Sequence, residues 1–537
     1  MNAIQILDCT LRDGGYINDW RFGEKTIKAI VSKLAEAGID IIECGFLRDG
    51  DFDRHRSLFN NVTDIRKYIA PKRDNTMYVA MIDQPYIPAQ KIGDCDGTSI
   101  DGIRITFHED EKEIEEAITL GKQLMDKGYK VFIQPVGTTS YSDEKLLNLI
   151  KKVNRLKPYA FYLVDTLGVM YKNDLLRLFH LLDHNLNPSI RIGFHSHNNL
   201  QLSFANAQEL LSLHTKRRII IDASVFGMGR GAGNLCTELL TQYINKNIKE
   251  KYMTLPLLEI VDEYMSPLDE DPKWGYSIPY YLAAVNQCHP NYASYLLNKQ
   301  TITVKSIHAI LKQLPMDLKD RYKEDYIEDL YIRHQEHDVD DRKARRAFKD
   351  MIGGRDILIL APGKSMITHK KDIDAFIREK NPFIISINFV PEAFPCHTTF
   401  FSNYKRYKKL VGTYAAQVVC TSNVVRNDEA GALVVNYSDL LLDDTAISDN
   451  AGLMLIQLLS QLSVTSVHLA GFDGFGKDKA ENYFSKALVN HSPIQNLMER
   501  NNAIRRQLRL FERKMAIDFV TDSAYLPLGE AMAGSFM

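Results

Sequence analysis

Paired cysteines are missing from this chain. None of its 7 cysteines forms a C-x-x-C pair, which argues against both a disulfide framework and a zinc site built from thiolates. The cysteines are most simply explained as reduced, mostly buried, small apolar residues.

An excess of charge of one sign is missing as well. Lysine and arginine total 66 against 68 aspartate and glutamate residues, which gives a formal net charge of −2. A chain with this balance has no global field that would attract nucleic acid or an anionic membrane. We therefore expect neither as a partner and favour small molecules.

Long apolar runs are absent too. No run of 18 apolar residues occurs, and the first residues, MNAIQ, lead into a strand pattern without the basic and apolar regions of a signal peptide. These features predict a cytoplasmic protein. Self-association, or association with a partner enzyme, stays open.

The first half of the chain carries a regular alternation of short apolar runs and amphipathic stretches such as EKTIKAIVSKLAEAG. Eight such βα units predict a (β/α)₈ TIM barrel, in which active sites gather at the C-terminal ends of the strands. The predicted strands are Ile4–Leu11, Ile39–Leu47, Met77–Ile82, Gly102–Phe107, Lys130–Val136, Ala160–Val164, Ile190–His195 and Ile219–Phe226.

A chain of 537 residues is too long for one core. We predict the barrel over residues 1–250 and a helical extension, rich in tyrosine and leucine, over residues 251–332. A charged segment, 333–354, would be either an exposed helix or a linker. Strand patterns then return, and they predict a smaller Rossmann-like α/β domain over residues 355–537 with an unknown ligand.

Two histidines at the end of the seventh predicted strand indicate a metal site. In FHSHNN, His195 and His197 are separated by one residue, and alternate side chains of an extended backbone point to the same side. Both imidazoles could therefore reach one ion, with Asp13 supplying an anionic oxygen from the end of the first strand. Two ordinary loop histidines are the alternative.

A glycine-rich stretch, GMGRGAGN, follows the eighth predicted strand. Its glycines would let the backbone approach a site closely, and Asn234 could offer an amide oxygen there. A flexible loop that caps a helix is the alternative explanation.

Four motifs in this order, LDCTLRDGG, IIECGF, FHSHNN and GRGAGN, resemble those of the DRE-TIM metallolyases, the HMGL-like proteins. The chain is most similar to their 4-hydroxy-2-oxovalerate aldolase branch. The resemblance covers about residues 1–330 and leaves the second domain unrecognised.

The resemblance implies a divalent ion bound by Asp13, His195 and His197, with Asn234 close by. Mn²⁺ or Mg²⁺ is expected for such a mixed set of oxygen and imidazole ligands. Zn²⁺ and Co²⁺ remain possible.

The resemblance also implies catalytic roles. Arg12 corresponds to the active-site arginine and Glu43 to the residue that holds it. Tyr280 corresponds to a tyrosine that closes the pocket, with Tyr276 and Tyr281 as the alternatives. Tyr16 stands where the aldolase has its catalytic histidine. A phenol with a pKa of about 10 is a poor base at neutral pH, so we predict that Tyr16 only shapes the pocket or orients a water molecule.

The predicted activity is that of a carbon–carbon lyase. It would catalyse aldol cleavage or condensation of a 4-hydroxy-2-oxo acid, with pyruvate enolate as the intermediate. One alternative is a Claisen-type synthase or lyase acting on an acyl-CoA thioester. The other is a barrel that has lost turnover through the change at Tyr16 and serves the second domain as a ligand-binding module.

Further polar residues lie near predicted strand ends. Gln134, the pair Asp165-Thr166 and His108 could face a substrate, but each could equally fix a loop. In the second domain, DILILAPGKSM runs from a strand into a glycine turn, where backbone N–H groups commonly hold phosphate. A nucleotide site and a purely structural sheet are both compatible with this pattern.

Overall fold

The computed structural model describes residues 4–265, 274–410, 417–425, 431–476, 482–484 and 494–526. The chain divides into two compact units, one of Met1–Pro290 with Met316–Arg321 and one of Asn291–Pro315 with Tyr322–Met537. Among the described helices, none combines the length and the apolar character needed to cross a bilayer.

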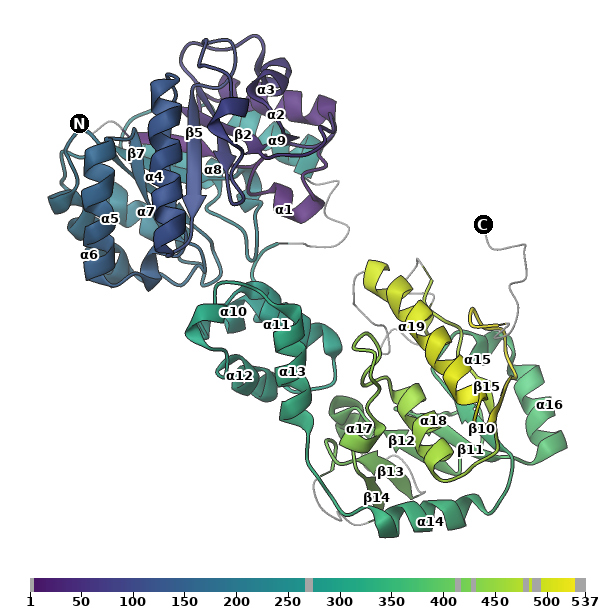
Figure 1. Ribbon diagram of the computed structural model, residues 1–537. Coiled ribbons are helices and arrows are strands. Elements are labelled where there is room, and N and C mark those ends of the chain that lie inside the picture. Colours follow the sequence, from purple (N-terminus) through teal and green to yellow (C-terminus); the bar gives the residue numbers. More distant parts are fainter. Residues whose placement is uncertain are drawn as a thin grey trace. The chain divides into compact units, whose positions relative to one another are not determined.

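The first unit is a closed barrel of eight parallel strands (Figure 1). The barrel closes because β1 pairs with β9 on one side and with β2 on the other. A short strand, β3 (Leu58–Phe59), adds to the edge of β2. The barrel strands are β1 (Ile4–Asp8), β2 (Ile41–Leu47), β4 (Met77–Ile82), β5 (Gly102–Phe107), β6 (Lys130–Pro135), β7 (Ala160–Asp165), β8 (Arg191–Ser196) and β9 (Ile219–Ala223). The predicted TIM barrel is thus confirmed.

Amphipathic helices surround the strands, and their apolar positions follow the helical repeat. In α2, Ile27, Ile30, Val31 and Leu34 are all buried, which places one continuous stripe against the sheet. The helices of the barrel are α1 (Gly15–Asn18), α2 (Glu24–Glu36), α3 (Val62–Ile69), α4 (Glu111–Asp126), α5 (Asp143–Leu156), α6 (Lys172–Asn185), α7 (Ser203–Ser212) and α8 (Thr237–Asn247).

The first strand ends earlier than predicted. It ends at Asp8 rather than at Leu11 because the backbone turns there: the N–H groups of Arg12 and Asp13 both donate to the carbonyl of Cys9, at 3.1 and 2.8 Å. Arg12 and Asp13 therefore lie on a tight turn at the C-terminal end of the strand, where barrel active sites are found.

Helices follow the barrel, as the sequence predicts. They are α9 (Leu255–Ile260) with the π-helical turn η4 (Val261–Met265), α10 (Ile278–Val285), α11 (Pro290–Lys299), α12 (Val304–Leu311) and α13 (Glu324–Gln335). Residues up to Pro290 group with the barrel, whereas α12 and α13 belong to the second unit. The domain boundaries at residues 250, 332 and 354 stay predictions.

The charged segment before Gly353 contains a helix, α14 (Arg342–Ile352). Most of its side chains are charged, but Phe348 and Ile352 are buried in the core of the second sheet. This stripe anchors the helix, which ends where Gly353 adopts a left-handed conformation with φ of 62°.

The second unit is built on a parallel sheet of seven strands in the order β14-β13-β12-β11-β10-β15-β16. This confirms the predicted Rossmann-like domain. The strands are β10 (Ile357–Leu360), β11 (Phe383–Ile387), β12 (Thr398–Phe401), β13 (Val418–Thr421), β14 (Ala432–Val435), β15 (Ser466–Ala470) and β16 (Ala516–Phe519).

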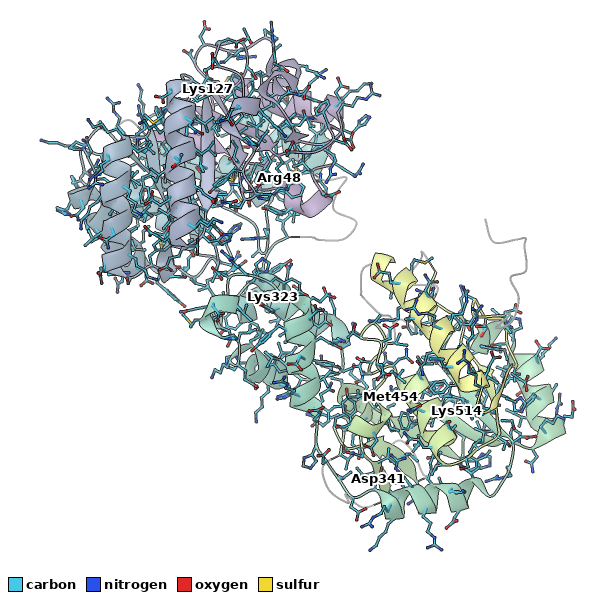
Figure 2. All side chains as sticks on the ribbon, viewed as in Figure 1. Arg48, Lys127, Lys323, Asp341, Met454 and Lys514 are labelled. Carbon is cyan, nitrogen blue, oxygen red and sulfur yellow. The ribbon has the colours of Figure 1, made fainter. Side chains whose placement is uncertain are left out.

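Both faces of this sheet are covered, because alternate residues of β10 point to opposite sides. Ile357 and Ile359 pack with α14, α18 (Ala451–Gln461) and α19 (Ile494–Glu512). Leu358 and Leu360 pack with α16 (Lys370–Lys380) on the other face. Met454 of α18 lies inside the first of these layers, whereas Lys514 is exposed (Figure 2). The remaining helices are α15 (Ser365–Thr368) and α17 (Tyr404–Leu410).

Candidate metal centre and active site

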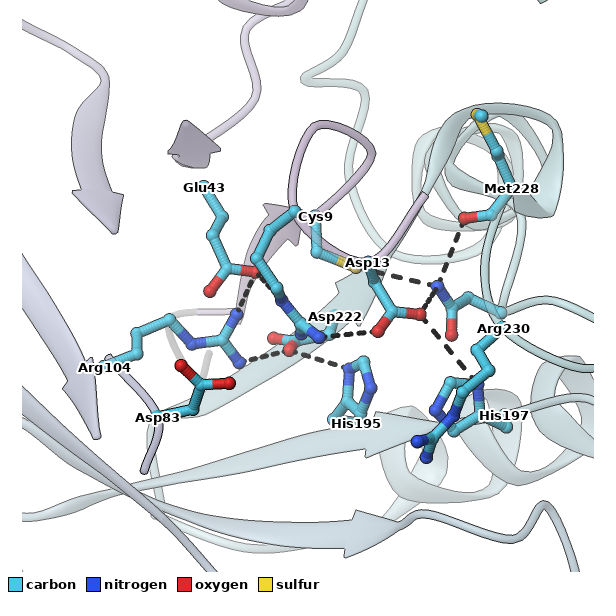
Figure 3. A network of polar contacts seen from close by, with 12 residues as sticks. Cys9, Asp13, Glu43, Asp83, Arg104, His195, His197, Asp222, Met228 and Arg230 are labelled. Atoms are coloured by element: carbon cyan, nitrogen blue, oxygen red, sulfur yellow. Dashed lines mark hydrogen bonds and ion pairs between the residues drawn. The ribbon is translucent and has the colours of Figure 1, made fainter. Parts of the chain in front are cut away.

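Asp13, His195 and His197 lie together at the C-terminal ends of β1 and β8. Each offers one ligand atom, and these atoms all lie within 4.8 Å of one another. The three side chains are buried, with at most 5% of any residue exposed. The alternation expected from FHSHNN therefore brings both imidazoles to the same carboxylate (Figure 3).

The protonation states in this cluster suit a metal ion. Burial lowers the pKa of His197 to about 3. Burial alone would raise the pKa of Asp13, but nearby positive groups, Arg12 foremost, hold that pKa well below its usual range. At neutral pH Asp13 is thus a carboxylate and His197 a neutral imidazole, which are the forms that bind metals.

Hydrogen bonds orient these side chains and leave atoms open for a ligand. His195 Nδ1 lies 3.1 Å from Asp222 Oδ2, so Nε2 is the nitrogen left for an ion. Asn234 Nδ2 donates to Asp13 Oδ2 at 2.7 Å. Within the described residues, the buried His197 Nδ1 and Asn234 Oδ1 have no hydrogen-bond partner. This donor set fits a divalent ion.

Arg12 lies beside the cluster and is held in one orientation. Its Nε donates to Glu43 Oε2 at 2.8 Å and its Nη1 to Asp13 Oδ1 at 2.5 Å. The third nitrogen, Nη2, is buried without a hydrogen-bond partner in the described part of the chain. A buried guanidinium with one open donor can bind an oxygen that carries negative charge.

Two further charged residues of this network, Arg104 and Asp222, were not predicted from the sequence. Arg104 is fully buried, lies 2.9 Å from Glu43 Oε2 and pairs with Asp222, which in turn orients His195 (Figure 3). The signal was available, because both residues interrupt otherwise apolar strands, GIRITF and IIIDA. A charge at a fully buried strand position is costly unless it is paired.

The glycine-rich loop approaches the cluster as predicted. A Cβ atom at Gly229 would lie 2.3 Å from Asn234 Nδ2 and 2.8 Å from Asp13 Oδ2. No side chain fits there without displacing one of these groups.

We expect Gly229→Ala to weaken divalent-metal binding about tenfold or more, the effect typical of disturbing groups that orient metal ligands. Isothermal titration with Mn²⁺ measures it. Gly93→Ala is the matched control, since a Cβ there would meet nothing nearer than 4.0 Å. Equal affinity of the two variants would contradict the proposed position of the ion.

Tyr16 lies at the edge of the site and is 41% exposed. Its ring is 4.8 Å from that of Trp20, centroid to centroid. Desolvation of the hydroxyl raises the pKa of Tyr16 above the usual 10, although Arg230 and Arg12 act in the opposite direction. This shift keeps Tyr16 protonated at neutral pH, so that little phenolate is present to accept a proton.

Arg230, from the same glycine-rich loop, was not singled out from the sequence. Its guanidinium carbon lies 5.7 Å from the centre of the Tyr16 ring, and its Nη1 is 3.4 Å from His289 Nε2. Tyr280, on α10, is partly buried, and burial raises its pKa. Among the described contacts, Tyr280 makes no hydrogen bond to Arg12 or to the cluster, so its pocket role stays a prediction.

The other predicted pocket residues mostly fix loops. Asp165 accepts from the N–H groups of Val169 and Met170 at 2.9 and 3.0 Å. Thr166 accepts from Gly137 N, and His108 contacts Glu113. Gln134 is buried, and its Oε1 has no hydrogen-bond partner among the described residues. Among these four residues, Gln134 is therefore the one whose buried acceptor atom is open to a ligand.

The backbone N–H groups of the glycine turn after β10 have partners within the protein. Gly363 N donates to Gly471 O at 3.0 Å and Ser365 N to Asp473 Oδ2 at 2.7 Å. The carboxylate of Asp473 thus occupies the place that a phosphate would take at this turn. At the turn itself the backbone donors of Gly363 and Ser365 are therefore used within the protein.

Comparison with known proteins defines the class of the barrel. Residues 3–261 match the model of the HMGL-like family. The matched range contains β1 to β9 and the whole cluster, so the barrel and its candidate site are similar to the HMGL-like family over these residues.

Individual relatives are distant. A 4-hydroxy-2-oxovalerate aldolase from Geobacillus genomosp. 3 is 28% identical over 276 residues, which cover 50% of this chain and 79% of the relative. An oxaloacetate decarboxylase from Mycobacterium tuberculosis is 27% identical over 242 residues, covering 45% of this chain and 70% of the relative. The solved N-terminal domain of a Bacteroides vulgatus protein is 26% identical, with a TM-score of 0.48, covering 55% of this chain and 96% of that domain.

Proposed function

We propose that the barrel is a divalent-metal-dependent carbon–carbon lyase that cleaves or forms a 4-hydroxy-2-oxo acid, with pyruvate enolate as the intermediate. The observation that carries the proposal is the open, buried Nη2 of Arg12 beside the group Asp13, His195 and His197. Similarity to proteins named 4-hydroxy-2-oxovalerate aldolase supports the choice of substrate class.

In cleavage, the bond between C3 and C4 breaks and its electron pair becomes an enolate whose charge lies on the keto oxygen. The 4-hydroxyl loses its proton, and the aldehyde leaves. A divalent ion held by Asp13, His195 and His197 would supply Lewis acidity that polarises the keto group. Mn²⁺ or Mg²⁺ is the ion that this ligand set favours.

Arg12 would donate from Nη2 to the keto oxygen as its charge develops. Because Glu43 and Asp13 already fix the guanidinium, no reorganisation is needed in the transition state, which is the condition under which such donors are most effective. Arg230 places a further positive charge at the edge of the site, suited to the substrate carboxylate.

The enzyme assay that tests this proposal uses the full chain with Mn²⁺ or Mg²⁺ and 4-hydroxy-2-oxo acids of increasing chain length. We expect pyruvate to be released, and chelation with EDTA to stop its release. A change in the concentration of free CoA when the protein is incubated with acyl-CoA thioesters would instead indicate the Claisen-type alternative. Bound metal without turnover of any 2-oxo acid would indicate a ligand-binding barrel.

Decarboxylation of a 2-oxo diacid is a second candidate, and the raised pKa of Tyr16 favours it. Loss of CO₂ from such an acid leaves the same enolate but requires no base for a hydroxyl proton. One distant relative is named oxaloacetate decarboxylase. The rate of CO₂ release from oxaloacetate is measured with the protein and metal and with metal alone. A higher rate with the protein would indicate decarboxylation.

We expect Tyr16→Phe to lower turnover less than about tenfold, because a phenol with a raised pKa is not the proton carrier. Tyr16→His should raise aldol turnover by supplying a base at this position. Steady-state kcat for pyruvate release measures both. If Tyr16→Phe abolishes aldol cleavage and leaves decarboxylation of oxaloacetate intact, then the phenol carries the proton and the assignment is wrong.

A further inference from the structure

The second unit contains a cavity of about 480 Å³ at the C-terminal edge of its sheet. Its lining includes Gly363 after β10, Asn388 after β11 and Asp473 after β15. The proposed lyase reaction makes no use of this cavity.

Sheet topology places this cavity where parallel α/β domains bind ligands. From β10 the chain adds strands outward to β14 and then returns to form β15 on the other side of β10. The connections after β10 and β15 therefore run in opposite directions and leave a crevice between them. Ligands of open α/β sheets bind at such a switch point.

Three asparagines in the lining have their oxygens occupied. Asn388 Oδ1 accepts from Ser402 N at 3.1 Å. Asn450 Oδ1 accepts from Leu453 N at 3.1 Å, where it caps α18, and Asn482 Oδ1 accepts from Gly476 N at 2.7 Å. Since the acceptor of each amide is used, these side chains offer a ligand their Nδ2 donors.

The lining carboxylates that are not exposed, Glu328, Asp449 and Asp473, are occupied as well. Asp449 accepts from Tyr331 OH at 2.6 Å. Glu328 accepts from Tyr295 OH at 2.7 Å and lies 2.8 Å from Lys299 Nζ. Asp473 accepts from Ser365 N and from its hydroxyl. The carboxylates without such buried partners, Glu324, Asp325 and Glu499, are exposed.

A cation adds to these donors. Arg500 of α19 lines the cavity and donates from Nε to Ala446 O at 3.1 Å. That bond fixes the guanidinium and leaves its two terminal nitrogens for a ligand. Arg500 and the Nδ2 atoms of Asn388, Asn450 and Asn482 thus offer donors to a ligand. Acceptor-rich groups such as phosphates suit these donors.

We propose that this cavity binds a nucleoside phosphate, free or as the activating group of a larger substrate. Amide donors and Arg500 would hold the phosphate, and the ring of Phe472 in the lining would offer a face for a base. Inorganic phosphate alone would leave most of a cavity of about 480 Å³ to water, whereas a nucleotide matches the usual size of such sites.

Isothermal titration of the full chain tests this assignment. The probes are the mono- and diphosphates of uridine, cytidine, adenosine and guanosine, beside the four nucleosides, inorganic phosphate and glucuronate. We expect at least one nucleoside phosphate to bind with 1:1 stoichiometry and at least tenfold more tightly than its nucleoside or inorganic phosphate. The sugar-linked form of the tightest-binding nucleotide is then compared with the nucleotide itself. Tighter binding of the sugar-linked form would identify the larger substrate, and binding of the nucleotide at least as tight would identify the free nucleotide.

Two variants link such binding to the cavity. Asn450→Asp keeps the oxygen that caps α18 but replaces the amide donor with a carboxylate oxygen, and Arg500→Gln removes the cation. Both should weaken binding tenfold or more. Arg509→Gln, an exposed arginine of the same helix, should change it less than twofold.

Absence of binding by every nucleoside phosphate would overturn the proposal. So would equal binding of inorganic phosphate, binding of glucuronate alone, or unchanged affinity in Asn450→Asp when its melting temperature matches that of the wild type.

Discussion

Arg12→Lys is expected to lower the turnover of the barrel about 100-fold or more, roughly 3 kcal/mol in the activation barrier, the size found for removing one such donor. Lysine keeps the charge but cannot contact Glu43 and Asp13 and still present a third nitrogen in the same plane. The loss should therefore fall on kcat. Metal stoichiometry should stay at one ion per chain.

Arg177→Lys is the matched control for this substitution. Arg177 pairs with Asp143 on the outer helices and is half exposed, so its replacement should leave kcat within twofold. A fall in kcat of less than about tenfold for Arg12→Lys, with metal retained, would show that Arg12 does not stabilise the transition state.

The double substitution His195→Ala with His197→Ala is expected to abolish stoichiometric binding of a divalent ion. Asp13 and the amide of Asn234 would remain, and two oxygen ligands do not hold Mn²⁺ or Mg²⁺ tightly without further partners. Metal analysis of the dialysed protein measures the loss, and pyruvate release should disappear with it.

His180→Ala with His184→Ala provides the control pair. These two histidines lie on α6, their ring centroids are 6.0 Å apart and both are exposed. The control variant should retain one ion per chain. One ion per chain in the His195 and His197 variant would place the metal elsewhere.

The positions of strands and metal ligands could be read from the sequence because both depend on short-range periodicity. Alternation along β8 fixes the shared direction of His195 and His197, and the βα repeat brings the end of β1 close to that of β8. The residues that support them were harder to find. Arg104 and Asp222 meet across the barrel, and their pairing depends on a register that no local pattern contains.

Two segments of the second unit show where the sequence pattern and the structure differ. The segment that contains α14 is highly charged because only one stripe of the helix, with Phe348 and Ile352, is buried. Its charge therefore did not distinguish a helix from a linker. The glycine turn after β10 resembles a phosphate loop in its residues, but Asp473, more than 100 positions away in the chain, takes up the donor of Ser365. Sequence proximity does not reveal such a long-range partner.

Mass analysis of pyruvate released in deuterated water is the most direct test of the central claim, that the barrel forms a pyruvate enolate. The full chain with Mg²⁺ would act on a 4-hydroxy-2-oxo acid or on oxaloacetate, and pyruvate would be trapped as it forms. An enolate takes its new proton from solvent, so we predict one deuterium in the methyl group. Absence of pyruvate from both acids, or a methyl group without deuterium, would contradict the account.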